Sequence, residues 1–214
     1  MRHFRKPALL ALTVLQITAQ AQALDSGTLV INGQISSTTC VLNMGDAGST
    51  GSGSKTLNLG TFTTTLANQQ TTPGGPIGNP QTALFSVKNP DGSNCTFSGA
   101  SKWDIGVNIP SSQFTTVSGT TVLLSSGSAS NIAANVGVRI STSTGASVTT
   151  GTTAVNFANG VAPYGTLLSG STSSPGANPT DTIALTAQMV RTSTSSSVTA
   201  GAFSTTIPLN VWYK

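Results

Sequence analysis

The segment AFSTTIPLNVWYK, residues 202–214, alternates apolar and polar side chains along most of its length. One face collects Phe203, Thr205, Ile207, Leu209, Val211 and Tyr213. A period of two residues is typical of a β-strand with one buried face. The chain stops one residue after Tyr213, so we expect no later strand to cover the free edge of this one.

The start of the chain has the pattern of a cleaved export signal. Its basic residues are Arg2, His3, Arg5 and Lys6. An apolar run follows over residues 8–15, and Ala21 and Ala23 are the small residues that a signal peptidase reads. The apolar run is short for a bilayer span, which favours cleavage over a retained anchor. We therefore expect residues 1–23 to be a signal peptide and residues 24–214 to form the exported protein.

The expected exported chain contains neither histidine nor glutamate, and its net charge is near +1. Its acidic residues are Asp25, Asp46, Asp91, Asp104 and Asp181. Its cationic residues are Lys55, Lys88, Lys102, Arg139, Arg191 and Lys214. These charges form no basic run or patch, so the sequence carries no electrostatic signature of nucleic-acid binding.

Patterns for catalysis are nearly absent from the same region. A serine or cysteine nucleophile would have no histidine base, and the aspartates show no close pairing of the glycosidase type. The glycine-rich residues 48–56 resemble a phosphate loop, but Ser54 separates Gly53 from Lys55 and breaks the required spacing. We expect a protein that is not an enzyme and that holds no cofactor or metal.

The two cysteines, Cys40 and Cys95, favour an intramolecular disulfide. An even number of cysteines in an exported chain is typical of disulfide pairing. Two thiols without histidine do not complete a zinc site, and their spacing is not that of a redox Cys-x-x-Cys pair.

The rest of the expected exported chain is interpreted as short strands separated by polar turns. Strands are expected at residues 28–35, 55–62, 83–88, 103–109, 121–125, 135–141 and 182–191, and in the final segment. Surface loops are expected at residues 45–54, 63–80, 142–153 and 169–179, and a short turn of helix at 129–134. This pattern predicts a single all-β domain with a β-sandwich architecture.

Several of these stretches resemble one known family. They are GTLVINGQI at 27–35 followed by Cys40, ALFSV at 83–87 leading to Cys95, NVGVRI at 135–140, and LTAQM at 185–189. Gly201, thirteen residues before the end, and the penultimate Tyr213 frame the last strand. In their order, these stretches resemble the major subunits of chaperone–usher fimbriae, the type 1 pilin-like family. The resemblance covers nearly all of the expected exported chain.

The resemblance implies an immunoglobulin-like β-sandwich that lacks its final strand and is completed by a donor strand from another subunit. It places the donor strand in residues 24–36, with Leu29, Ile31, Gly33 and Ile35 filling the groove. The edge that receives a donor strand or a chaperone would be formed by Gly201, Phe203, Ile207, Leu209, Val211 and Tyr213.

The function implied by the resemblance is that of a structural fimbrial subunit supporting cell adhesion. Its partners would be identical or related subunits, a periplasmic chaperone and an outer-membrane usher. It would pass through the periplasm to the extracellular fimbrium of a Gram-negative bacterium.

Three alternatives stay open at this point. The segment between the cysteines is long for a compact major subunit, which fits an unusual major subunit or a minor pilin. A minor or tip/adaptor pilin that binds a host glycan is the first alternative. A self-complete secreted β-sandwich with a binding role is a second alternative. The third concerns residues 28–35, because their periodicity fits pairing within their own domain as well as pairing with another chain.

Overall fold

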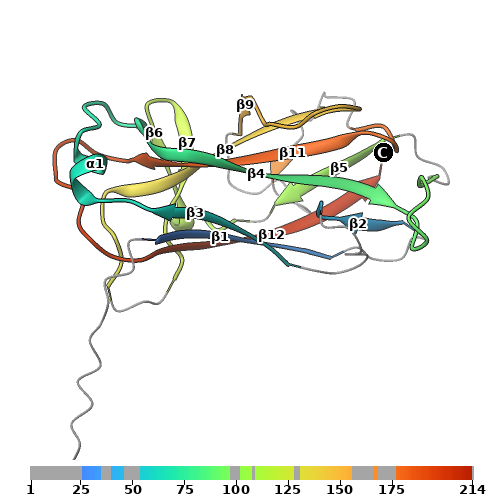
Figure 1. Ribbon diagram of the computed structural model, residues 1–214, viewed down its shortest axis with the longest axis horizontal. Helices are drawn as coiled ribbons and strands as arrows, with labels where there is room; N and C mark the ends of the chain where they lie inside the picture. Colours follow the sequence, from blue (N-terminus) through green and yellow to red (C-terminus); the bar gives the residue numbers. More distant parts are fainter. Residues whose placement is uncertain are drawn as a thin grey trace, which may run out of the picture.

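The computed structural model describes residues 26–34, 40–45, 54–96, 102–107, 109–127, 131–155, 166–167 and 177–213. Their strands form two sheets that face each other (Figure 1). In the first sheet the order is β10 (Thr166–Leu167), β5 (Trp103–Val107), β12 (Phe203–Tyr213), β1 (Ser26–Gln34) and β3 (Ser54–Thr61). The protein is therefore all-β, compatible with the expected β-sandwich.

The second sheet has the order β2 (Val41–Asn43), β4 (Pro76–Lys88), β11 (Thr182–Arg191), β8 (Val136–Gly145), β7 (Thr120–Leu123) and β6 (Phe114–Val117). The short β9 (Thr153–Ala154) pairs with β8. Among the named strands that the structure describes, neighbours are antiparallel except β1 and β12, which run parallel.

Helix is scarce in the described residues, where it consists of α1 (Thr64–Asn68) and the 3-10 turn η1 (Ser111–Gln113). The hydroxyl of Thr63 caps α1 by accepting a hydrogen bond from the Leu66 amide at 3.1 Å. In the described part of the chain, no helix is long and apolar enough to span a membrane.

Three sequence-based expectations are wrong here. Residues 142–153 are not one surface loop, because β8 runs on to Gly145. Residues 63–80 are not one surface loop, because they contain α1 and the start of β4. Residues 131–134, the described part of the helix expected at 129–134, are not helical. Ile132 instead pairs with Ala202, just ahead of β12. The backbone hydrogen bond from Ala202 N–H to the Asn131 carbonyl, at 2.8 Å, draws this segment out of a helical path.

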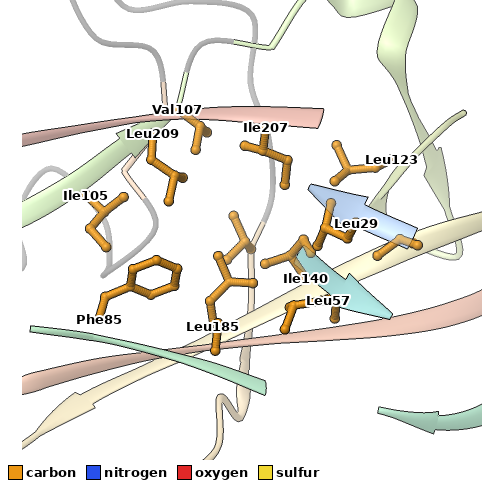
Figure 2. Packing of buried hydrophobic residues seen from close by; sticks show 14 of the residues in the cluster. Leu29, Leu57, Phe85, Ile105, Val107, Leu123, Ile140, Leu185, Ile207 and Leu209 are labelled. Atoms are coloured by element: carbon orange, nitrogen blue, oxygen red, sulfur yellow. The ribbon is translucent and has the colours of Figure 1, made fainter. Parts of the chain in front are cut away.

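The core lies between the sheets and takes side chains from both. Figure 2 shows Ile207, Leu209 and Val107 of the first sheet lying opposite Phe85 and Leu185 of the second. All five are at most 2% exposed. Each fully buried side chain of this size stabilises the fold by roughly 1.5–3 kcal/mol relative to an exposed one. The strands are therefore held together mainly by this shared apolar layer.

The predicted disulfide is confirmed: Cys40 is bonded to Cys95, with 5.7 Å between their Cα atoms. Both cysteines are buried. The bond ties the segment leading into β2 to the segment after β4, across a sequence separation of 55 residues. A loop of that length corresponds to about 4 kcal/mol of stabilisation in the chain-entropy description.

Candidate functional site

The candidate site is the joint between β1 and its two neighbours, β12 and β3. β1 runs parallel to β12 from the pair Gly27–Phe203 to the pair Gln34–Asn210. Its other edge pairs antiparallel with β3, with one irregularity between Gly27 and Thr28. Figure 1 shows β1 lying alongside β12, within the same layer. The β1 joint therefore occupies the interior of the first sheet.

Leu29 anchors β1 in the core. It is 0% exposed and pairs in register with Thr205 of β12 and Leu57 of β3. Leu57 and Thr205 are also buried. Figure 2 shows the Leu29 side chain close to Leu57 and Ile140, so it reaches the layer contributed by the second sheet. This packing makes Leu29 part of the domain's own core.

The other expected donor residues are described only by their backbone or not at all. Ile31 pairs in register with Ile207, and Gly33 pairs with Leu209. Ile35 lies outside the described residues. Within this chain, the segment therefore pairs with its own domain, which is the in-domain alternative left open by the sequence.

The predicted buried face of the last strand is confirmed where its side chains are described. Phe203, Thr205, Ile207 and Leu209 are buried and Val211 is partly buried, whereas Thr206 and Pro208 are exposed. The side chain of Tyr213 lies outside the described part of the chain, but its backbone pairs with Trp103 of β5. β12 is thus an inner strand, bordered by β5 on one side and by β1 on the other.

Gly201, the remaining residue of the expected edge, is required by close packing. A Cβ atom at this position would lie 2.4 Å from the Ala133 amide nitrogen and 2.6 Å from the Ile132 carbonyl carbon. Those atoms belong to the backbone, so they cannot rotate away. Gly201 therefore lets the segment before β12 pass directly against residues 132–133.

We expect Gly201→Ala to lower the free energy of unfolding by about 1–3 kcal/mol, because the new methyl group overpacks against backbone. Gly127→Ala is the matched control, since the atom nearest to its Cβ would be the Ser204 Cβ at 3.4 Å, an ordinary contact. Urea unfolding monitored by tryptophan fluorescence measures both changes. Equal unfolding midpoints for the two variants would contradict the packing role of Gly201.

An apolar pocket lies between α1 and the segment that leads into β12. Its lining includes Phe62, Ala67, Ile77, Met189, Val198 and Phe203. We call it the α1 pocket, because the residues around α1 form one of its walls. Its volume is about 40 Å³. Sequence reasoning missed this pocket, since its walls come from segments distant in the chain and no periodic pattern marks them.

Arg191 holds the pocket wall in place. Its guanidinium donates hydrogen bonds to the carbonyl oxygens of Asn68, Gln70, Ser193 and Ser196, at 2.7–3.0 Å. These bonds join the end of α1 to the loop after β11. The side chain is only 7% exposed, so its charge is stabilised by carbonyl dipoles in a largely dry environment.

A second pair of bonds reinforces the same connection. The Asn68 side-chain oxygen accepts from the Val198 amide at 2.8 Å, and its amide group donates to the Val198 carbonyl at 3.4 Å. Val198 itself lines the α1 pocket. The position of this wall is thus fixed by polar groups that do not line the pocket.

The described residues gather no set of possible metal ligands. No group of three or more histidine, cysteine, aspartate or glutamate side chains gathers in the part of the chain that the structure describes. Asp91 is exposed, in the turn after β4. Hydrogen bonds from the Ser93 side chain and then its backbone N–H lower the pKa of Asp91. The joint itself is built from apolar side chains and paired backbone.

No protein-family model matches this chain, and no curated protein matches it either.

Proposed function

We propose that this chain is a structural subunit of a bacterial surface fimbria, and that it polymerises by exchanging β1 between neighbouring copies. The observation that carries the proposal is the position of β1 between β12 and β3. Without β1, the first sheet would have a gap one strand wide, bordered by Leu57, Ile207 and Leu209. All three are now buried. One short segment therefore decides whether this sheet is complete.

A copy of the same segment from another chain has the chemistry to fill that gap. The joint consists of backbone hydrogen bonds and apolar contacts, and these do not depend on which chain supplies the strand. Exchange of an identical element between copies is a low-cost route to assembly, because it replaces each contact with an equivalent one. In the polymer, the donor strand would carry Leu29, Ile31, Gly33 and Ile35.

The proposal includes partners that cover the gap during export. A long, apolar, unpaired strand edge promotes aggregation. A periplasmic chaperone would therefore bind β12 until an outer-membrane usher brings the next subunit. The finished fimbrium would lie outside a Gram-negative cell and support its adhesion. The pairing of β1 within its own domain would then be a closed state that precedes exchange.

A self-complete secreted β-sandwich is the second candidate, and one observation favours it. β1 is already paired on both edges, and Leu29 is fully buried within the same chain. A domain with this arrangement needs no second copy to complete its sheet. The two candidates differ in whether β1 ever leaves its own domain.

We expect Gram-negative cells that express this chain with its chaperone and usher to carry surface fibres built from it. Electron microscopy of the cells and gel electrophoresis of sheared material are the measurements. Strand-exchanged subunits should resist dissociation in detergent without heating and appear as a ladder of multimers. Cells that lack the chain should lack both fibres and ladder. Recovery of the chain only as a monomer would favour the self-complete sandwich.

A further inference from the structure

Three polar side chains meet just before β5 and β11 begin. Trp103, the first residue of β5, pairs antiparallel with Ala177, and their backbones exchange two hydrogen bonds of 2.8 Å. The next residues outward from this pair, Lys102 and Asn178, are therefore direct cross-strand neighbours whose side chains lie on the same side. Asp181 follows three residues after Asn178. We call Lys102, Asn178 and Asp181 the lysine–amide cluster.

The side-chain amide of Asn178 is held at both its oxygen and its nitrogen. The Lys102 amine donates a hydrogen bond to the amide oxygen at 2.5 Å. The amide nitrogen donates to the Asp181 carboxylate at 2.7 Å, and the same carboxylate oxygen accepts from the Asn178 backbone N–H at 2.7 Å. A nitrogen nucleophile and a carboxyl group thus contact the two ends of one amide.

Buried neighbours fix this arrangement. Trp103 and Ala177 are fully buried, and Asp181 is 7% exposed. The Trp103 indole N–H and the Asp181 backbone N–H both donate to the Asn178 backbone carbonyl, at 2.8 and 2.9 Å. Groups held next to each other in this way react as if their concentration were raised by orders of magnitude.

The outer side of the cluster is open to solvent. Lys102 is partly exposed and Asn178 is exposed. Water can therefore take up protons from the lysine amine, and a small leaving group such as ammonia can escape. A bond that forms once in the life of each chain needs no fast turnover.

Proline at position 179 blocks the usual self-reaction of an asparagine side chain. Asparagine commonly loses ammonia when the backbone nitrogen of the next residue attacks its side-chain carbonyl carbon. The nitrogen of Pro179 carries no hydrogen that it could give up in this attack. The amine of Lys102 is the nucleophile that the fold instead brings into contact with this amide.

We propose that Lys102 and Asn178 form an isopeptide bond, with Asp181 as the proton carrier. The Lys102 amine loses one proton to water, attacks the Asn178 Cγ to form the new C–N bond, and then loses a second proton to water. Asp181 takes up a proton from water and passes it to Nδ2, so that the old Cγ–Nδ2 bond breaks and ammonia leaves. Water protonates the ammonia, so one ammonium group and one amide become a new amide and one ammonium ion, with no change in oxidation state.

The bond would join the two sheets covalently. Lys102 leads into β5 of the first sheet, and Asn178 leads toward β11 of the second. The Cys40–Cys95 disulfide, in contrast, joins segments beside β2 and β4, which both belong to the second sheet. The isopeptide bond would hold the sheets together under reducing conditions as well, whether or not the chain assembles into fimbriae.

The direct test compares the intact mass of the exported protein with that of a Lys102→Arg variant. The unmodified chain should be lighter by one ammonia molecule than its sequence requires, whereas Lys102→Arg should have its full mass. Trypsin does not cleave after a lysine whose amine is in an amide, so digestion should release one branched peptide that contains both Lys102 and Asn178. Full mass in the unmodified chain, or an ammonia loss that maps to another site, would overturn the proposal.

Lys88 is a matched control within the same chain. Its amine donates to the Asn94 side-chain oxygen at 2.8 Å, but in the described part of the chain no carboxylate accepts a hydrogen bond from the Asn94 amide nitrogen. Lys88→Arg should leave the ammonia loss unchanged, and digestion should show Lys88 and Asn94 unlinked. A cross-link at Lys88 would overturn the requirement for a carboxyl group.

Asp181→Asn tests the proton carrier, since asparagine has nearly the same size but does not transfer a proton in this way. The cross-linked fraction of freshly exported protein, sampled over time by mass, should rise about tenfold more slowly or less. An unchanged rate in Asp181→Asn would overturn the role of Asp181. The mass of the unmodified chain decides whether the bond forms even if this variant folds poorly.

Discussion

Joining β1 to β12 with a disulfide between Val30→Cys and Thr206→Cys is expected to abolish polymer assembly, and reduction is expected to restore it. Val30 and Thr206 are direct neighbours in the parallel register, and Thr206 is exposed. Paired strands lie about 4.8 Å apart, within the usual range of about 4.4–6.8 Å between the Cα atoms of a disulfide. The bond would hold β1 in its own domain, so that no donor strand is available to another copy.

The two single-cysteine variants are the controls, since each carries one substitution without the cross-link. Assembly is measured as the detergent-resistant ladder and as fibre mass, before and after mild reduction. Cys40 and Cys95 are at most 2% exposed, so the native disulfide should resist a reductant that opens the engineered one. Normal polymers from the oxidised double variant would show that β1 is not the exchanging strand. A loss that reduction does not reverse would contradict the expected recovery.

The sequence predicted strands best where one face is apolar and the other is polar. β12 is the clearest case, because Ile207 and Leu209 are buried while Thr206 and Pro208 are exposed. A period of two residues records the local geometry directly. The same pattern placed β1 within two residues of its observed start and one of its observed end.

The first half of β4 was missed because its own residues argue against a strand. Pro76, Gly78 and Pro80 are typical of turns, and Gly78 has a φ of +66°. Tertiary contacts hold this stretch in place. The Gln188 side chain donates to the carbonyls of Ile77 and Gly78 at 2.9 and 3.1 Å. No pattern local to residues 76–80 contains that information.

The sequence pattern also did not predict which strand pairs with β1. Leu29 has the same alternating neighbours whether its strand pairs with its own domain or with another chain, so periodicity does not choose between them. The choice depends on free energies summed over the whole joint. The α1 pocket depends similarly on residues far apart, such as Phe62 and Phe203, which the fold brings together.

The structural role of Arg191 could not be predicted from the sequence. In the sequence it counts only as one of a few scattered cations. In the structure it is a largely buried guanidinium whose four hydrogen bonds connect two segments that follow different strands. Its location at the end of the buried strand β11 gave no local signal of this role.

Replacing Arg191 with methionine is therefore expected to lower the free energy of unfolding by about 3–5 kcal/mol. Methionine keeps much of the side chain's length but donates no hydrogen bond. The carbonyls of Asn68, Gln70, Ser193 and Ser196 would lose their shared donor. Since small domains unfold with only about 5–15 kcal/mol in total, the loss should be visible as a large shift of the urea midpoint.

Two further variants separate the hydrogen bonds from the charge. Arg139→Met removes a partly exposed cation from β8 and should change stability by less than about 1 kcal/mol. Arg191→Lys keeps the charge, but a single ammonium cannot reproduce the planar fork that reaches four carbonyls. The free energy of unfolding of Arg191→Lys should therefore lie nearer to that of Arg191→Met than to that of the unmodified chain. A stable Arg191→Lys variant would mean that the charge alone suffices, and that the guanidinium geometry does not hold α1 against the loop after β11.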